Sequence, residues 1–266
     1  MWRLAAVTVL VAAAALPAHA EVTEAARQAR WADLQHAIFG DKPVQDGGEV
    51  IDIETPQRAE DAAIVPLSVH VADDMAKKTR KLYLVIDNNP SPLAGVFHFG
   101  PAGDAHAIAT RVRIDDYTYI HAIAETDDGT LYAAQRFIKA AGGCSAPAGK
   151  DQTAALKRLG QMKFALTAPA APGLDTAQLL ISHPNNSGLQ MDQVTRQYVP
   201  ADFIQRLRVS YAGEEVFTLD TDITLSENPM VRFSFVAPRA GELRAELEDS
   251  HQRHFDQHWP VSAAVD

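Results

Sequence analysis

The sequence has 266 residues, 47% of them hydrophobic and 22% charged, a composition that indicates a globular protein with real cores rather than a disordered chain. Its net charge of −10, from 34 acidic and 24 basic residues, argues against nucleic acid as a partner and favours a soluble protein. The chain has one cysteine, which excludes a disulfide within one molecule.

Residues 1–20 have the pattern of a secretory signal. Arg3 gives a short positive start, residues 4–16 are apolar, and residues 18–20 (Ala-His-Ala) fit a cleavage site before Glu21. The apolar stretch is too short for a membrane-spanning helix, which needs about 20 residues, and no later segment is longer or more apolar. We therefore expect a soluble protein, exported to the periplasm, with no membrane span. Loss of Arg3 would change its net charge from −10 to −11.

After the signal, the spacing of apolar residues first fits a helix and then fits β-strands. Residues 23–39 place Trp31, Leu34 and Ile38 on one face, with Gly40 as a stop, which predicts an amphipathic helix. Alternating apolar residues and regular turn signals, without intervening helices, then predict an antiparallel sandwich. The strand candidates lie at residues 51–53, 65–71, 82–86, 96–99, 108–114, 119–124 and 131–138, with a hairpin turn at 127–129.

The second half repeats this pattern. Its strand candidates lie at residues 179–181, 204–211, 216–219, 231–236 and 243–247. Between the halves, Asp151 is expected to cap a short helix that carries Leu156, Leu159 and Met162, and a Pro-rich link follows at 168–173. The sequence thus predicts an all-β fold of two immunoglobulin-like sandwiches. The expected domains are residues 21–145 and 174–266, joined by a Gly/Ala/Pro-rich linker at 146–173.

The only cysteine, Cys144, lies in a run of small residues between the two predicted sandwiches. Gly142 and Gly143 precede it and Gly149 follows, so both sides of the cysteine have residues that can act as hinges. This setting predicts a displayed thiol on a mobile arm, either free, paired to another molecule or carrying a covalent cargo.

A carrier thiol must ionise before it can be loaded. Depression of its pKa below the ordinary value of about 8.5 requires nearby cations or a helix N-terminus. We hypothesise that the positive charge that lowers the pKa of Cys144 comes from Lys139, Lys150 and the N-terminus of the helix beginning at Asp151.

Other residue groups indicate no further chemistry. His251, His254 and His258, with Asp256, lie in a strand or terminal tail, where residues three apart point to opposite faces, so no metal site is expected. His98 and His183 are interpreted as packed or surface histidines. Residues 185–187 formally fit a glycosylation acceptor but are interpreted as a turn. We predict no cofactor and no catalytic apparatus.

Short motifs in chain order carry a family resemblance. In the first half they lie at residues 89–93, 97–99, 120–124 and 142–144; in the second half at 183–184, 187–189, 199–204, 227–233 and 240–241. The first set resembles the SoxY sulfur carrier, and the second resembles its partner SoxZ. The resemblance covers nearly all of the chain after the signal.

This resemblance implies two paired immunoglobulin-like subunits joined in one polypeptide, which raises their effective concentration. It also implies that Cys144 bears sulfur intermediates of thiosulfate oxidation, which separate enzymes load, oxidise and hydrolyse. The fused form resembles carriers associated with periplasmic quinoprotein dehydrogenases. The family arm is a free C-terminal end, whereas here about 120 residues follow Cys144, and Ser145 and Ala146 replace the two glycines after the cysteine.

The expected function is therefore a non-catalytic periplasmic carrier loaded at Cys144. Two alternatives stay open: a thiol-dependent peroxidase or transferase, and a thiol-independent interaction module for a periplasmic dehydrogenase. Replacement of Cys144 with serine separates the module from the other two, and turnover by the isolated protein separates carrier from enzyme.

Overall fold

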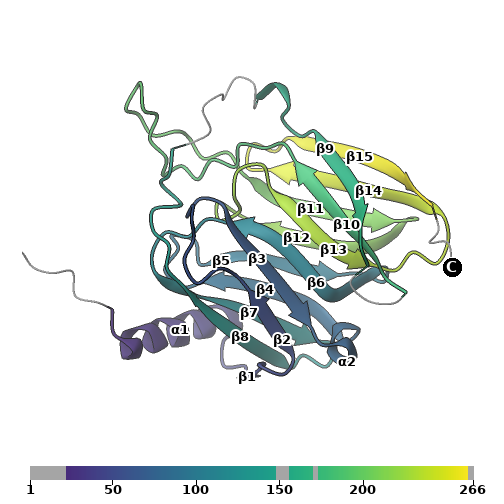
Figure 1. The fold of residues 1–266 in the computed structure, drawn as a ribbon, viewed down its shortest axis with the longest axis horizontal. Helices are drawn as coiled ribbons and strands as arrows, with labels where there is room; N and C mark the ends of the chain where they lie inside the picture. The colour runs from purple at the N-terminus through teal and green to yellow at the C-terminus, as the bar shows by residue number, and fades with distance from the viewer. Residues whose placement is uncertain (1–21, 148–155, 170–172, 263–266) are drawn as a thin grey trace, which may run out of the picture.

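The computed structural model describes residues 22–147, 156–169 and 173–262, and its two β-sheets face each other around a core (Figure 1). The expected all-β sandwich fold is confirmed. The predicted signal, residues 1–20, lies outside the described residues.

The elements of the first half are α1 (Glu24–Phe39), β1 (Val44–Asp46), β2 (Ile51–Glu54), β3 (Val65–Val71), α2 (Asp73–Ala76), β4 (Thr79–Ile86), β5 (Leu93–Phe99), β6 (Gly103–Val112), β7 (Thr118–Thr126) and β8 (Leu131–Ile138). Those of the second half are β9 (Met162–Thr167), β10 (Asp175–Ile181), β11 (Ile204–Tyr211), β12 (Glu214–Thr221), β13 (Met230–Phe235), β14 (Gly241–Asp249) and β15 (His254–Val261).

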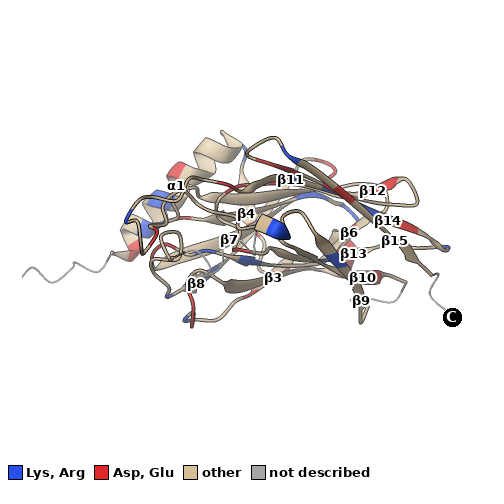
Figure 2. Ribbon diagram, turned by 90° about the horizontal axis from the view of Figure 1, so that it is seen from above, with Lys and Arg blue, Asp and Glu red and all other residues tan. Residues whose placement is uncertain are grey.

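The predicted N-terminal helix is present as α1. The hydroxyl of Thr23 caps its first turn by accepting a hydrogen bond from the Ala26 N–H, and the helix ends at Gly40, whose φ of 65° favours glycine. Trp31, Leu34 and Ile38 pack with Ile123 and Leu131 of the nine-stranded sheet. Figure 2 shows α1 on the outer side of this sheet. Among the described residues, no helix is long and apolar enough to cross a membrane.

The strands form two continuous sheets. The nine-stranded sheet has the order β1-β8-β7-β4-β5-β12-β11-β14-β15, and the six-stranded sheet has the order β2-β3-β6-β13-β10-β9. All pairs are antiparallel except β1 with β8, which is parallel. The alternating burial of β2 and β3 matches the predicted period of two, with every second side chain in the core.

Both sheets run across the junction between the two halves. In the larger sheet β5 pairs with β12, which sets Phe97 opposite Leu219, and in the smaller sheet β6 pairs with β13, which sets Ile108 opposite Phe233. The core is likewise shared, since the rings of Phe97 and Phe217 lie 5.4 Å apart. The two predicted sandwiches are therefore joined edge to edge.

Three local elements differ from the expectation. The one-turn helix α2 lies between β3 and β4, where no helix was predicted, because a single turn is too short to show a 3.6-residue period. The strand β9 occupies part of the expected linker, so the second half begins before residue 174. The expected helix start at Asp151 and the centre of the Pro-rich link lie outside the described residues.

Candidate functional site

Cys144 lies in a short segment that follows β8, at the junction of the two halves. Its exposed fraction is 0%, and the segment around it is described through Pro147. The expectation of a displayed thiol is therefore wrong for this conformation. The reason is that residues from both halves pack around the segment, and periodicity within the segment carries no information about them.

The first half binds the segment through its backbone. The N–H groups of Gly142 and Gly143 donate to the carbonyl oxygens of Asp115 and Ile114, at 2.8 and 2.9 Å. Gly143 allows a close approach: a Cβ there would overlap the carbonyl oxygen of Ala62 and lie 2.7 Å from that of Ile114. Gly142 has a φ of 78°, a conformation that favours glycine. Here Gly143 therefore serves close packing of the segment. Gly149, the third predicted hinge, lies outside the described residues.

The second half covers the segment with one loop. The hydroxyl of Ser187 donates to the carbonyl oxygen of Cys144 at 2.5 Å, and the side-chain amide of Gln190 donates to that of Ala146 at 3.1 Å. The backbone N–H of Ser187 in turn donates to Gln190 Oε1, which holds these two side chains together. Residues 187–190, which we call the covering loop, thus hold the cysteine segment against the first half.

The Cys144 thiol is kept neutral by its surroundings. Burial, followed by the negative charge of Asp115, raises the pKa of the thiol to about 12, although Arg113 acts in the opposite direction. The hypothesis of a depressed pKa is therefore wrong for the buried thiol. Lys139 is not among the groups that shift this pKa, and Lys150 and Asp151 lie outside the described residues. A protonated, buried thiol is unreactive until the segment moves.

Among the described residues, Arg113 is the cation that lowers the pKa of this thiol. Its side chain is almost fully buried, and its Nη1 donates to the carbonyl oxygens of Leu225 and Ile223. Its Nε is also buried but has no hydrogen-bond partner among the described residues. Burial lowers the pKa of Arg113, whereas the charges of Cys144 and Glu227 raise it. No periodic pattern in the sequence singles out this residue, which follows the last residue of β6.

Asn89 connects Arg113 to the segment that receives the cysteine arm. Its side-chain amide donates to the carbonyl oxygen of Arg113 at 2.7 Å, and its Oδ1 accepts from the N–H of Asp115 at 2.9 Å. Asn89 lies in the turn between β4 and β5, at the start of the family motif at residues 89–93. The turn therefore fixes the backbone to which Gly142 and Gly143 bind.

The comparisons with known proteins agree with this arrangement. The family model of sulfur oxidation protein SoxY matches residues 35–144, and that of sulphur oxidation protein SoxZ matches residues 164–260. The chain joins a SoxY domain and a SoxZ domain. The SoxY match ends at Cys144, and the covering loop belongs to the SoxZ domain.

Solved structures give weaker likenesses. The sulfur carrier protein SoxY from Chlorobium limicola f thiosulfatophilum is 24% identical, with a TM-score of 0.37, over 44% of this chain and 96% of that chain. Superoxide reductase (neelaredoxin) from Ignicoccus hospitalis is 18% identical, with a TM-score of 0.30, over 34% of this chain and 79% of that chain. The search of curated proteins gave no match. These TM-scores are low, so the two family matches carry the identification.

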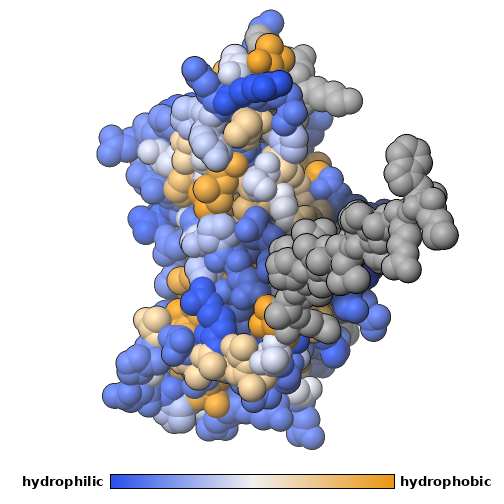
Figure 3. Space-filling view, turned by 90° about the vertical axis from the view of Figure 1, so that its left-hand side faces the viewer, coloured by the Kyte–Doolittle hydropathy of each residue, from blue (hydrophilic) through white to orange (hydrophobic). Residues whose placement is uncertain are grey.

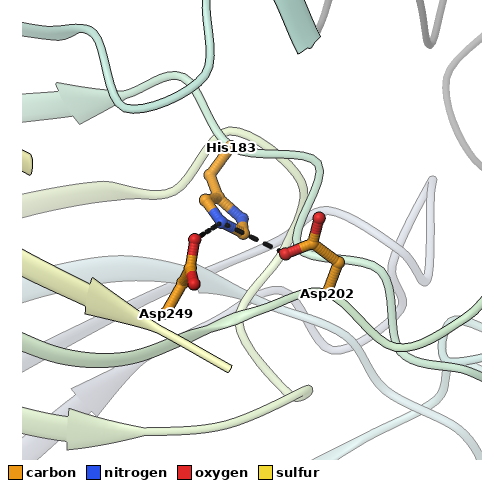
Figure 4. A group of neighbouring side chains, drawn as sticks. All are labelled: His183, Asp202 and Asp249. Carbon is orange, nitrogen blue, oxygen red and sulfur yellow. Dashed lines mark hydrogen bonds and ion pairs between the residues drawn. The ribbon is translucent and has the colours of Figure 1, made fainter. Parts of the chain in front are cut away.

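The SoxZ domain contains a buried ionic group formed by His183, Asp202 and Asp249 (Figure 4). His183 Nε2 lies 3.5 Å from Asp249 Oδ2 and 3.6 Å from Asp202 Oδ1, while its Nδ1 accepts from the N–H of Asn185. Burial lowers the pKa of His183, which favours the neutral ring with its proton on Nε2. The guanidinium of Arg253 also binds both carboxylates, with Nε 2.6 Å from Asp249.

The group of His183, Asp202 and Asp249 has the spacing of metal ligands, but the partners of these side chains indicate a structural role. Their ligand atoms lie within 4.8 Å of one another, a grouping that the sequence analysis did not find. Because the Arg253 guanidinium already binds both carboxylates, a metal ion would have to displace it. The group positions Asn185, whose amide donates to the carbonyl oxygen of Leu225, the oxygen that Arg113 also binds.

The other histidines considered as packed residues or metal ligands lie on or near the surface. His98 is half-exposed and lies 3.2 Å from Asp220. His254, Asp256 and His258 occupy exposed positions of β15, where Arg244 binds Asp256, and His251 lies 3.2 Å from Asp202.

A polar cavity of about 500 Å³ lies in the SoxY domain under α1. His121 and Trp31 line it with their rings stacked 3.7 Å apart, and His121 Nε2 lies 3.1 Å from the buried Asp87. His121 belongs to the family motif at residues 120–124, but the sequence predicts no contact for it.

Proposed function

We propose that this chain is a periplasmic, non-catalytic carrier that holds a sulfur intermediate covalently on Cys144 and presents it to partner enzymes. The observation that carries the proposal is the position of the chain's one cysteine. It ends the SoxY match and lies where the SoxY and SoxZ domains meet. Periplasmic location rests on the predicted signal at residues 1–20, and association with a quinoprotein dehydrogenase rests on the family resemblance.

The buried conformation corresponds to a sheltered state of such a carrier. Four hydrogen bonds hold residues 142–146 to the two domains, and each is expected to contribute about 1 kcal/mol. An arm held this weakly can leave its site at a cost of a few kcal/mol. In the sheltered state the thiol is protonated, and in the open state it regains the ordinary reactivity of an exposed cysteine.

The chain beyond the covering loop offers a surface for a partner enzyme. Val194 is 91% exposed and Tyr198 is 66% exposed, and both follow Gln190, which holds the arm. Hydrophobic side chains also reach the surface in patches at the end of the molecule drawn in Figure 3. A partner that contacts residues 191–198 could loosen the covering loop as it receives the cysteine.

The carrier proposal is tested by the mass of the native protein. The protein purified from its own periplasm is expected to have a mass above that of the processed chain, and a reductant should remove the excess. The Cys144→Ser variant, prepared in parallel, is the control and should show no adduct. Absence of any adduct from the wild-type protein while sulfur substrate is being oxidised would contradict the proposal.

Burial of the thiol favours one alternative, the thiol-independent interaction module. In that case Cys144→Ser would retain full function in a cell-based assay of the partner pathway.

The enzyme alternative has less support, because none of the hydrogen bonds found among the described residues joins Cys144 Sγ to a histidine. Loss of function in Cys144→Ser, without turnover by the isolated wild-type protein, supports the carrier.

A further inference from the structure

We propose that the polar cavity under α1 binds the free N-terminus of a partner protein. The partner chain would lie as a short parallel strand on the open edge of β8, with its α-ammonium group beside Asp46. This inference goes beyond the proposed carrier function, because the site lies under α1 in the SoxY domain and does not use the thiol.

The first step concerns a gap along the outer edge of β8. At one end of the gap, the N–H of Gly47 donates to the carbonyl oxygen of Ala133 at 2.8 Å. At the other end, the N–H of Lys139 donates to the carbonyl oxygen of Gln57 at 2.9 Å. Between these contacts the chain leaves the edge to form β2 in the other sheet. Residues 135–137 therefore have no strand beside them on this side among the described residues.

The backbone of β8 offers hydrogen bonds to a guest strand in this gap. Thr126 and Thr130 form the hydrogen-bonded pair that closes the β7–β8 hairpin, and such pairs alternate along an antiparallel ladder. The backbone groups of Gln135 and Phe137 consequently point away from β7, and no hydrogen bond joins them to another described residue. A guest strand can donate one N–H to the Gln135 carbonyl oxygen and accept one from the Phe137 N–H.

The gap has the length of a chain end rather than of a long strand. Gly47 already occupies the edge position before Gln135, and Gln57 occupies the position after Phe137. A guest of three residues fits between them. Since both ends of the gap are closed by the protein's own backbone, a terminus fits where a continuous strand would have to bend out twice.

The cavity gives the side chains of the guest room on both faces of this edge. On the face toward α1 it is lined by Trp31 and by His121, whose rings stack 3.7 Å apart. On the face toward the other sheet it is lined by Ile53 and Arg136, and Arg136 Nε donates to the Ile53 carbonyl oxygen at 3.1 Å. Because side chains alternate along a strand, the first and third guest residues face α1 and the second faces Ile53.

Charge selects which terminus binds. Asp46 lines the cavity and pairs with Ala133, whose side chain packs in the same cluster as α1, so Asp46 lies on the α1 face at the start of the gap. Arg136, the arginine in the lining, is already bound to Asp52 Oδ1 at 3.0 Å. The first residue of a parallel guest lies opposite Gln135, next along the edge from Asp46. Its α-ammonium group would therefore meet a carboxylate that is free to pair with it.

The gap is also close to the cysteine along the chain. Ile138 ends β8, and Cys144 follows six residues later. A partner held at this edge would be anchored beside the strand from which the arm extends. Residues 191–198 of the SoxZ domain would stay available for a second contact.

The test uses the peptide Thr-Val-Thr-Gly-Gly-amide with a free N-terminus, titrated into the full chain by isothermal titration calorimetry. Its valine would face Ile53, and its second threonine would lie opposite Phe137, over whose ring Arg27 lies. One comparison peptide is acetylated at the N-terminus. Another is N-methylated at the valine, which removes the N–H that would bind the Gln135 carbonyl oxygen. A fourth is acetylated and ends in a free carboxylate.

We expect the free-amine peptide to bind at least about tenfold more tightly than the acetylated one and at least about fivefold more tightly than the N-methylated one. Asp46→Asn keeps the acceptor for the Gly48 N–H and should reduce the preference for the free amine to less than about twofold. Asp33→Asn, at an exposed acid of α1 outside the cavity, is the matched control and should leave the preference unchanged. Saturating peptide should slow amide exchange at Phe137 by at least about fivefold.

No binding of the free-amine peptide at about 1 mM would overturn the inference. Equal affinities for the free and acetylated peptides would do the same, because the cavity would then take a side chain or a small molecule. Tightest binding of the peptide with a free carboxylate would assign the site to a C-terminus instead. A dimer that excess peptide dissociates would identify a second copy of this chain as the occupant and would also contradict the proposal. Cys144→Ser should bind the peptide as the wild type does, so this test fails independently of the adduct test for the carrier.

Discussion

The hydroxyl oxygen of Ser187 lies 2.5 Å from the carbonyl oxygen of Cys144, to which it donates a hydrogen bond. The two residues are 43 positions apart and belong to different domains, so the SoxZ domain holds the backbone of the SoxY-domain cysteine. Access to the thiol therefore depends on residues outside its own domain.

Removal of the Ser187 hydroxyl should make Cys144 more reactive. Ser187→Ala deletes one hydrogen bond that holds the arm, worth about 1 kcal/mol, so the open population and the alkylation rate should increase about fivefold. The rate is measured with iodoacetamide by intact mass. Ser210→Ala on β11, whose hydroxyl has no hydrogen bond among the described residues, is the control. An unchanged rate in Ser187→Ala would show that the covering loop does not limit access.

Gly143→Ala should displace the arm more strongly. The added methyl group would overlap the backbone carbonyl of Ala62, which cannot rotate away as a side chain would. We expect alkylation of Cys144 to increase by more than tenfold, since loss of the close approach also removes the hydrogen bond to Ile114. Gly48→Ala is the control, because a Cβ there lies 3.5 Å from Asp46, an ordinary contact. A protected thiol in Gly143→Ala would contradict this account.

The sequence predicts elements well where local pattern decides them. The bounds predicted at residues 131–138 and 204–211 are those of β8 and β11 in the structure. In β11 the alternating residues Leu207, Val209 and Tyr211 are buried, whereas β8 buries only its two end residues, Leu131 and Ile138. By contrast β9 has only three alternating apolar residues, of which Met162 also fits a helix. The continuity of the sheets from β5 to β12 depends on edge-to-edge pairing, which periodicity does not encode.

The site was predicted less completely than the fold. Cys144 stands out as the one cysteine, and the small residues around it indicate unusual backbone packing. Its burial could not be predicted, because Ser187 and Gln190 of the other domain provide it. Arg113 has no motif of its own, and its importance follows only from an unpaired nitrogen inside the protein.

Alkaline pH should weaken the contribution of Cys144 to stability. Burial raises the pKa of its thiol to about 12, well above the ordinary value of a cysteine. Because the folded-state pKa lies above that of the unfolded chain, the neutral buried thiol contributes stability that is complete below about pH 9 and decreases as the pH rises toward 12. The Tm of the wild-type protein minus that of Cys144→Ala should therefore fall between about pH 8 and about pH 10.5. A constant difference would mean that the thiol ionises without leaving its site.

The group at His183 should be independent of metal. The Arg253 guanidinium binds both Asp202 and Asp249, so treatment with a chelator should leave the Tm unchanged. His183→Ala should lower the free energy of unfolding by about 2 kcal/mol, because the buried N–H of Asn185 loses its acceptor. His98→Ala, at a half-exposed histidine, is the control and should change it by less than about 0.5 kcal/mol. A fall in Tm on chelation, reversed by a divalent cation, would instead identify a bound metal.

Cleavage of the chain between its domains should leave them associated. A protease recognition sequence placed within residues 148–155 allows the backbone to be cut after folding. The two fragments would still share both sheets, through β5 with β12 and β6 with β13, and a core in which Phe97, Phe217 and Phe233 are fully buried. We expect them to elute together in size-exclusion chromatography, because such an interface resembles an obligate one. Phe217→Ala, which removes a ring at the centre of the junction, should weaken the cut complex by about 3–5 kcal/mol. Separate elution of the wild-type fragments would mean that covalent fusion, rather than sheet pairing, keeps the covering loop over Cys144.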